Sequence, residues 1–222
     1  MTWKQSRSGL AIDLVDPDLS AIHIRLDIAV PLSLINRFDG HAGRGEQAGY
    51  SVAQHCIKDA DAILHETGGD TDAALAFLLH DAHEVFSGDI TTPVAESLDR
   101  MALDTLGRPA NGIIRRAIKT MKARLDAEIY KRLGLGWPLS AHRAHLVADM
   151  DLRMLRAERD ELMRPAPKPW GNAIETALPI PNLGWRDFLS MRPADVQGEW
   201  IHRLMAWHPT PESLSLEPEG AA

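Results

Sequence analysis

The feature that most constrains the fold is an apolar run followed at once by four titratable side chains. Ala73–Leu79 contains apolar residues alone, and His80, Asp81, His83 and Glu84 come directly after it. Such a run belongs in a hydrophobic core, so the groups behind it begin close to the interior. Burying a histidine beside an aspartate is unfavourable unless something compensates, and a bound metal ion is the strongest compensation. The segment therefore predicts a core helix that carries a metal site.

Composition narrows the class of protein. The 222 residues suffice for one substantial core, and the hydrophobic share of 45% and charged share of 25% are typical of globular proteins. A net charge of −7 and a pI of 5.8 argue against a dedicated nucleic-acid binder. They leave a nucleotide substrate open, because a nucleotide needs only a few local cations.

The sequence also predicts the compartment in which the protein works. Cys56 is the single cysteine, which excludes an intrachain disulfide and favours a reducing, cytoplasmic compartment. The first residues lack the apolar segment of a signal peptide, and no stretch approaches the roughly 20 apolar residues of a membrane span. We therefore expect a cytoplasmic protein without a membrane or nucleic-acid partner.

Caps and helix breakers predict a nearly all-α chain. One short strand is expected over Leu10–Val15. Ser51, Thr71, Thr92 and Ser140 are expected to cap helices, because their hydroxyls can accept from orphan N–H groups. The expected helices cover 18–38 (with a break at Pro31), 51–66, 71–87, a stretch opening at 92, 108–133, 140–163, 185–189 and 194–207.

Two units are expected along the chain. Residues 1–163 form the domain that carries the chemistry. A proline-rich stretch at 164–169 opens a C-terminal extension, 164–222, whose tryptophans pin it onto the domain. The last dozen residues are expected to be disordered.

Candidate metal ligands lie on three separate helices. Imidazole with carboxylate, as in His80 and Asp81, suits zinc, manganese or cobalt, but two ligands are too few. His55 lies at the edge of a buried helix face. The simpler interpretation is that it is a partly buried core histidine rather than a metal ligand. Helical periodicity puts Asp151 on an apolar stripe and Asp149 on a solvated face, so Asp151 is the better ligand.

The order histidine, His-Asp, aspartate over helices resembles the HD-domain metal-dependent phosphohydrolases. Within that superfamily the chain is most similar to bacterial 5′-deoxynucleotidases and to phage-type hydrolases that include dATP triphosphohydrolases. The resemblance covers residues 8–163, and its motifs lie at 36–38, 51–55, 79–84, 88–93 and 151–155 with Glu158. It implies an HD-domain helical bundle with a short N-terminal strand and a C-terminal extension.

The resemblance also implies a ligand set and a catalytic group. The metal ligands would be His55, His80, Asp81 and Asp151, around one divalent ion: manganese, cobalt or zinc, with magnesium or a second ion on the substrate phosphates as alternatives. Asp81 and Glu84 would be the catalytic residues, with Glu84 handling the proton of the attacking water.

Four further positions would meet the substrate. Arg37 matches an arginine that contacts phosphate, which a guanidinium fork suits. Phe38 stands where relatives often have tryptophan. Asp89 matches an acid that helps to select deoxyribose, and Thr92 would lie near the sugar, although a turn or a cap also explains these two residues.

Four other residues carry more than one interpretation. His83 could face the pocket, but solvent is the simpler expectation. Glu158 shares the buried face of Asp151, which favours a structural pairing with an arginine. Lys122, like Lys119, is expected on a solvated helix face.

The expected function is metal-dependent release of phosphate from deoxynucleoside 5′-monophosphates. The monophosphate is favoured because the sequence has no clear extra cationic cluster. A dNTP triphosphohydrolase would use the same site, and hydrolysis of guanosine tetraphosphate alarmones is a third option. A sensor or scaffold that binds metal and nucleotide without turnover is the alternative from another class. A homodimer or higher homo-oligomer is expected.

Overall fold

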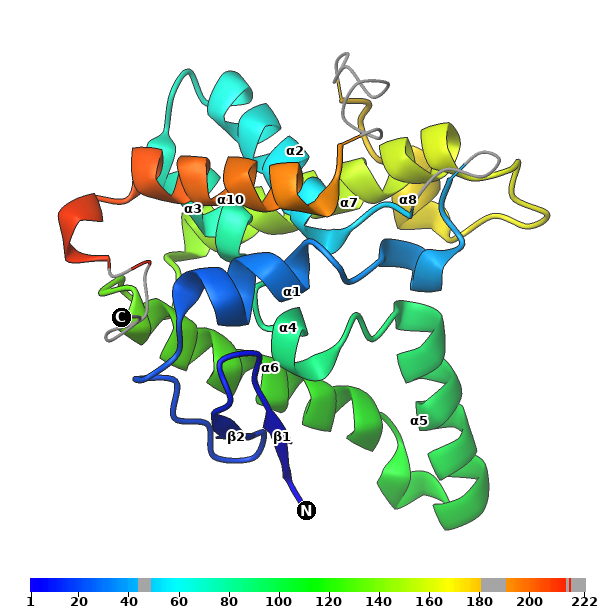
Figure 1. Ribbon diagram of the computed structural model, residues 1–222. Helices are drawn as coiled ribbons and strands as arrows, with labels where there is room; N and C mark the ends of the chain where they lie inside the picture. The colour runs from blue at the N-terminus through cyan, green and yellow to red at the C-terminus, as the bar shows by residue number, and fades with distance from the viewer. Residues whose placement is uncertain (44–48, 181–190, 215, 217–222) are drawn as a thin grey trace.

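The computed structural model describes residues 1–43, 49–180, 191–214 and 216. Helices dominate these residues, which confirms the all-α prediction (Figure 1). The small sheet pairs β1 (Trp3–Gln5) antiparallel with β2 (Ala11–Asp13). The expected strand at Leu10–Val15 is therefore present but shorter, and its partner β1 was not predicted.

The helical elements follow one another through the chain. They are η1 (Ile24–Ala29, a π-helix), α1 (Val30–Leu32), η2 (Arg37–Gly40), α2 (Val52–Glu66), α3 (Thr71–Leu79), α4 (Glu84–Ser87), α5 (Thr92–Leu106), η3 (Arg108–Ala110), α6 (Ile113–Arg132), α7 (Ala141–Leu162), α8 (Asn172–Thr176), α10 (Pro193–Trp207) and η4 (Pro211–Ser213). The three short η elements other than η1 are 3-10 helices.

The centre of the core is α3, packed against α2. Residues Ala73–Leu79 of α3 are all buried, as the apolar run predicted. In Figure 1, α10 crosses one side of this pair and α7 lies on the other, while α6 and α5 form the lower part of the molecule. The side chains that follow α3 therefore enter the interior between α6 and α7.

Several predicted helix boundaries are wrong for local reasons. The helix expected to run to Ser87 ends at Leu79, and turns at 80–83 separate it from α4. The helix expected from Asp18 begins only at Ile24, and Pro31 sits in the first turn of α1, where its missing N–H is not needed.

The helix expected over 108–133 is also divided. Gly112 has φ 69°, a left-handed conformation that glycine adopts without a steric penalty, and α6 begins after it.

The predicted caps are confirmed at two of four positions. Ser51 and Ser140 accept from backbone N–H groups at the starts of α2 and α7. Asp70 rather than Thr71 caps α3, because its carboxylate accepts from Ala73 N at 2.9 Å. Thr92 is the first residue of α5, and Thr91 precedes it in extended conformation.

Part of the C-terminal extension packs tightly onto the rest of the chain. Trp200 of α10 is fully buried, and its Nε1 donates to the Leu78 carbonyl at 3.2 Å. The helix expected at 185–189 lies outside the described residues, as do 215 and 217–222 from the tail expected to be disordered. Within that tail, η4 is ordered and Leu214 is buried, which corrects the prediction there.

Among the described residues, every helix falls short of the length and apolar character that a membrane crossing needs.

Candidate metal centre

Three elements bring two imidazoles and two carboxylates to one point. His55 lies one turn into α2, His80 and Asp81 directly follow α3, and Asp151 lies on α7. From His55 Nε2 the distances are 3.2 Å to His80 Nε2, 3.4 Å to Asp151 Oδ1 and 3.7 Å to Asp81 Oδ2. Metal–ligand bonds of about 2.1 Å place neighbouring ligand atoms about 3.0–3.4 Å apart. His55, His80 and Asp81 thus form one group able to hold an ion, while Asp151 forms a second such group with His55 and Asp59.

The outer nitrogens of the two histidines are already engaged. His80 Nδ1 lies 2.7 Å from the Phe77 carbonyl, so it carries the proton and donates it there. His55 Nδ1 lies 2.8 Å from Glu158 Oε1 and donates to that carboxylate. The two Nε2 atoms thereby face each other, and metal-ligating histidines are oriented in the same way, with the outer nitrogen engaged.

The negative charge around these rings favours a cation between them. Burial lowers the pKa of His80, but the Asp81 and Asp151 carboxylates outweigh it and raise the pKa to about 9. Burial raises the pKa of Asp59, which lies on α2 within 3.2 Å of His55 Nδ1, well above its ordinary range. This donor set and its field fit a metal cation.

Glu158 of α7 connects His55 to Arg37, the residue predicted to bind phosphate. It is fully buried, accepts from His55 on one oxygen, and accepts from Arg37 Nε on the other at 3.2 Å. The prediction that Glu158 pairs with an arginine is confirmed. Arg37 also lies 3.4 Å from Asp81 Oδ2, so its guanidinium is held at the edge of the metal site.

A short backbone pairing positions this arginine. Arg37 N donates to the Tyr50 carbonyl at 2.8 Å, and Asn36 forms a bridge with Ser51, the cap of α2. The next residue, Phe38, has a left-handed φ of 55°, which is uncommon outside glycine and concentrates at functional sites.

Phe38 forms part of a small aromatic group beside the arginine. Its ring lies 5.5 Å from the Arg37 guanidinium and 6.0 Å from the ring of Trp170 in the extension. The sequence has Phe38 where relatives often have tryptophan, and nothing in it predicted that Trp170 comes close to this position. Phe38 and Trp170 are far apart in the sequence, so no local sequence pattern connects them.

Glu84 and Asp89 lie on the side of the site that Asp81 faces. Glu84 is buried; burial, reinforced by the charge of Asp81, raises its pKa to about 8. Lys122 of α6 contacts Glu84 Oε1 at 3.3 Å, so the prediction of a solvated Lys122 is wrong. Burial also raises the pKa of Asp89, with Arg37 opposing and Asp81 adding to the shift.

Two other predictions about individual residues have different outcomes. Asp149 is half-exposed and pairs with Arg153 of its own helix, and the side chain of Asp151 is nearly as exposed. Thr92 is exposed at the start of α5 rather than buried with the cluster.

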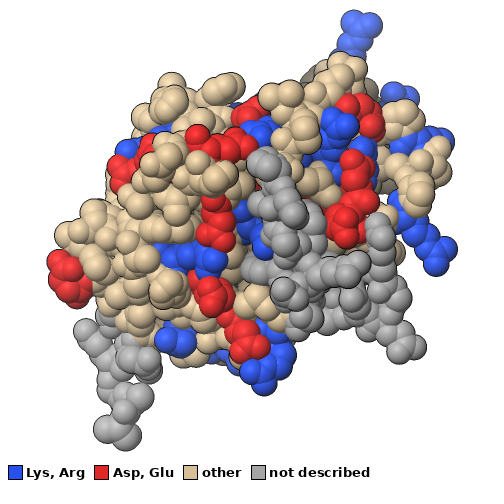
Figure 2. All heavy atoms as spheres, turned by 90° about the horizontal axis from the view of Figure 1, so that it is seen from above, with Lys and Arg blue, Asp and Glu red and all other residues tan. Residues whose placement is uncertain are grey.

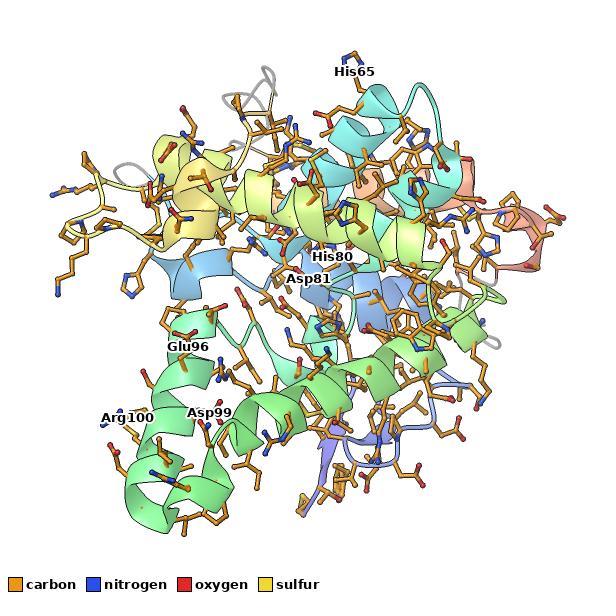
Figure 3. All side chains as sticks on the ribbon, turned by 180° about the vertical axis from the view of Figure 1, so that it is seen from behind. His65, His80, Asp81, Glu96, Asp99 and Arg100 are labelled. Atoms are coloured by element: carbon orange, nitrogen blue, oxygen red, sulfur yellow. The ribbon has the colours of Figure 1, made fainter. Side chains whose placement is uncertain are left out.

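The surroundings of the site differ in charge from the cluster itself. In Figure 3 the labelled His80 and Asp81 lie centrally between α6 and α7, while Glu96, Asp99 and Arg100 lie along α5 and His65 lies at the far end of α2. Figure 2 shows Lys and Arg side chains interspersed with Asp and Glu on one face. Neither sign of charge dominates the described residues of that face.

The fold and site define an all-α protein with a buried histidine–carboxylate cluster able to hold a metal ion. No family model matches the chain. It is 36% identical to an uncharacterized protein of Rhodobacter capsulatus over 143 residues, which span 57% of this chain and 71% of that protein. The chain belongs to the same family as this Rhodobacter protein.

Proposed function

We propose that this protein is an HD-type, metal-dependent phosphohydrolase that acts on nucleotides. The observation that carries the proposal is the approach of His55 Nε2 and His80 Nε2 to 3.2 Å while both Nδ1 atoms are engaged elsewhere. Two imidazole nitrogens approach this closely when a cation, either a proton or a metal ion, lies between them. With Asp81 and Asp151 beside them, the four side chains would hold a divalent metal ion.

The neighbouring side chains suit hydrolysis of a phosphate ester. A divalent cation in this site would supply Lewis-acid activation of water and of a phosphoryl oxygen. Arg37 would bind phosphate oxygens and offset the negative charge that develops on them. Glu84, buried and with a raised pKa, would take a proton from the attacking water or return one to the leaving group.

The proposed substrate is a deoxynucleoside 5′-monophosphate, which would yield a nucleoside and phosphate. Asp89 would face the sugar, and Phe38 with Trp170 would offer an apolar surface to the sugar or base. A dNTP triphosphohydrolase remains the second candidate. Lys122 favours it, because this cation beside Glu84 adds to Arg37 the positive charge that a longer phosphate chain requires.

The proposal is tested with a panel of ribo- and deoxynucleotides, from mono- to triphosphates, in manganese, cobalt or zinc. Phosphate and triphosphate products are measured separately. His80→Ala and Asp81→Ala should abolish turnover and leave the helical circular dichroism unchanged. His65→Ala is the matched control, because His65 is exposed at the far end of α2.

Near-wild-type turnover of either site variant in metal-replete buffer would end the hydrolase proposal. If the wild type binds metal and nucleotide but releases no product, the sensor alternative replaces it. The alarmone alternative is tested by including guanosine tetraphosphate in the panel.

The expected homo-oligomer and cytoplasmic location stay predictions. Light scattering on the purified full chain measures the first, and fractionation of the native cells measures the second.

A further inference from the structure

A second group of potential ligands lies directly beside the first. Asp81, His83 and Glu84 each offer one ligand atom, and these atoms lie within 4.8 Å of one another. The group lies where successive turns at 80–83 separate α3 from α4, with backbone hydrogen bonds of the i→i−3 type from Ala82 N to Leu79 O and from Glu84 N to Asp81 O. His83 and Glu84 are 5% and 3% exposed.

Two atoms of this group are buried without a hydrogen-bond partner. They are His83 Nε2 and Glu84 Oε2. A buried polar atom without a partner costs about 1–3 kcal/mol. Two such atoms in one small group indicate that something absent from the chain itself satisfies them.

The partner of His83 fixes the chemistry of its free nitrogen. His83 Nδ1 lies 2.8 Å from Asp126 Oδ1 of α6 and donates its proton to that carboxylate. Nε2 is then a bare lone pair and needs an electron-pair acceptor. Glu84 Oε2 is also without a partner, since Lys122 occupies the other oxygen of that carboxylate. A metal cation can bind both atoms at once.

We propose that His83 Nε2, Glu84 Oε2 and the Asp81 carboxylate bind a second divalent cation, with Asp126 orienting His83. The inference rests on the proposed function, because Asp81 would bridge this ion and the one held by His55, His80 and Asp151. Two-metal hydrolase sites hold their ions about 3.5–4 Å apart, a spacing that one bridging carboxylate supports. One imidazole with two carboxylates suits manganese or cobalt.

With Oε2 on this second ion, Glu84 would handle the proton of the proposed hydrolysis through Oε1, the oxygen that contacts Lys122. The second ion would lie on the side of Asp81 that carries Glu84, while Arg37 contacts Asp81 and Glu158. Phosphate oxygens of the substrate would complete the coordination of the second ion.

The test is the metal stoichiometry of the full-length protein, measured with Mn²⁺ alone by equilibrium dialysis and electron paramagnetic resonance. The wild type should bind two ions and show an exchange-coupled signal. His83→Asn should bind one ion and lose that signal. Asparagine keeps a side-chain N–H near the position of Nδ1 for Asp126 and has no atom in the position of Nε2. Asp126→Asn should lower the affinity for the second ion about 10- to 100-fold, which is the usual effect of losing an orienting partner.

His65→Asn makes the same chemical change outside the site and should still bind two ions. A wild type that binds one ion, lost in His80→Ala but kept in His83→Asn, would overturn the second site and leave the proposed function standing. A wild type that binds no ion would overturn both. Two ions in His83→Asn, with the coupled signal intact, would also overturn the second site.

Discussion

At the residue scale, the site depends on acids that do not themselves reach the proposed metal. Glu158 accepts from His55 Nδ1 and from Arg37 Nε, so one buried carboxylate orients both a ligand and the proposed phosphate contact. Burial would raise the pKa of Glu158, but Arg37 and His55 outweigh it and lower the pKa. Its charge is therefore part of the electrostatic balance of the centre.

Removing the charge of Glu158 should weaken metal binding. Glu158→Gln keeps the shape of the side chain but removes the negative charge that His55 and Arg37 share. We expect the metal affinity to fall about 10- to 100-fold, the usual effect of losing an orienting partner. A competition titration with a chromophoric chelator measures it. Glu161→Gln, three residues along the same helix, is the control, and equal affinities for the two variants would contradict the role of Glu158.

At the scale of elements, buried carboxylates join neighbouring segments at their ends. Asp99 of α5 accepts from Ile114 N at 2.8 Å and so caps α6, which lacks a side-chain cap of its own. Asp27 of η1 accepts from Ser8 N and Ser8 Oγ in the turn between β1 and β2, and from His23 N. These bonds fix the hairpin and η1 relative to each other.

The Asp27 linkage should make stability depend on pH. Burial opposes ionisation of Asp27, but the hydrogen bonds from His23 and Ser8 outweigh it and lower its pKa in the folded protein. The contribution to stability is therefore complete above the unfolded-state pKa of about 3.9 and disappears as the pH falls through the lower folded-state value.

A single substitution measures the stability that Asp27 contributes. Asp27→Asn should lower the free energy of unfolding at pH 7 by about 1–3 kcal/mol, because bonds to a charged acceptor are lost. The gap between variant and wild type should narrow at acidic pH, as urea denaturation at a series of pH values would measure. A gap that stays constant down to the lowest pH at which both proteins fold would contradict the argument.

At the scale of the whole molecule, the C-terminal segment is part of the core. Trp200 is fully buried against α3, and its indole N–H satisfies the Leu78 carbonyl in the helix that leads to His80 and Asp81. Trp170 reaches the other side of the site through Phe38. The extension therefore stabilises the elements that position the metal ligands.

Removing the buried indole should have a large effect. Trp200→Ala should lower the free energy of unfolding by about 3–5 kcal/mol, the usual cost of deleting a large buried aromatic side chain. Chemical denaturation followed by circular dichroism measures it. Trp3→Ala is the comparison, because Trp3 is 45% exposed and should change stability little. A small effect at Trp200 would mean that α10 is not part of the cooperative core.

The sequence by itself determined the helical class, the burial of 73–79 and the choice of Asp151 over Asp149. These features depend on periodicity and on caps within a few residues, where local sterics and hydrogen bonding decide the outcome. The four proposed ligands were found because a histidine or an aspartate beside an apolar stripe is unfavourable without a partner. The structure brings those four together.

Only the tertiary structure decided what surrounds them. The chain turns at 80–83, where helical periodicity predicted a continuous helix, and this turn buries His83 against Asp126, 43 residues away. Lys122 reaches Glu84 across 38 residues, and Trp200 reaches Leu78 across 122. A partner so distant leaves no mark on the local pattern, because its energy appears only when packed helices bring the two groups into contact.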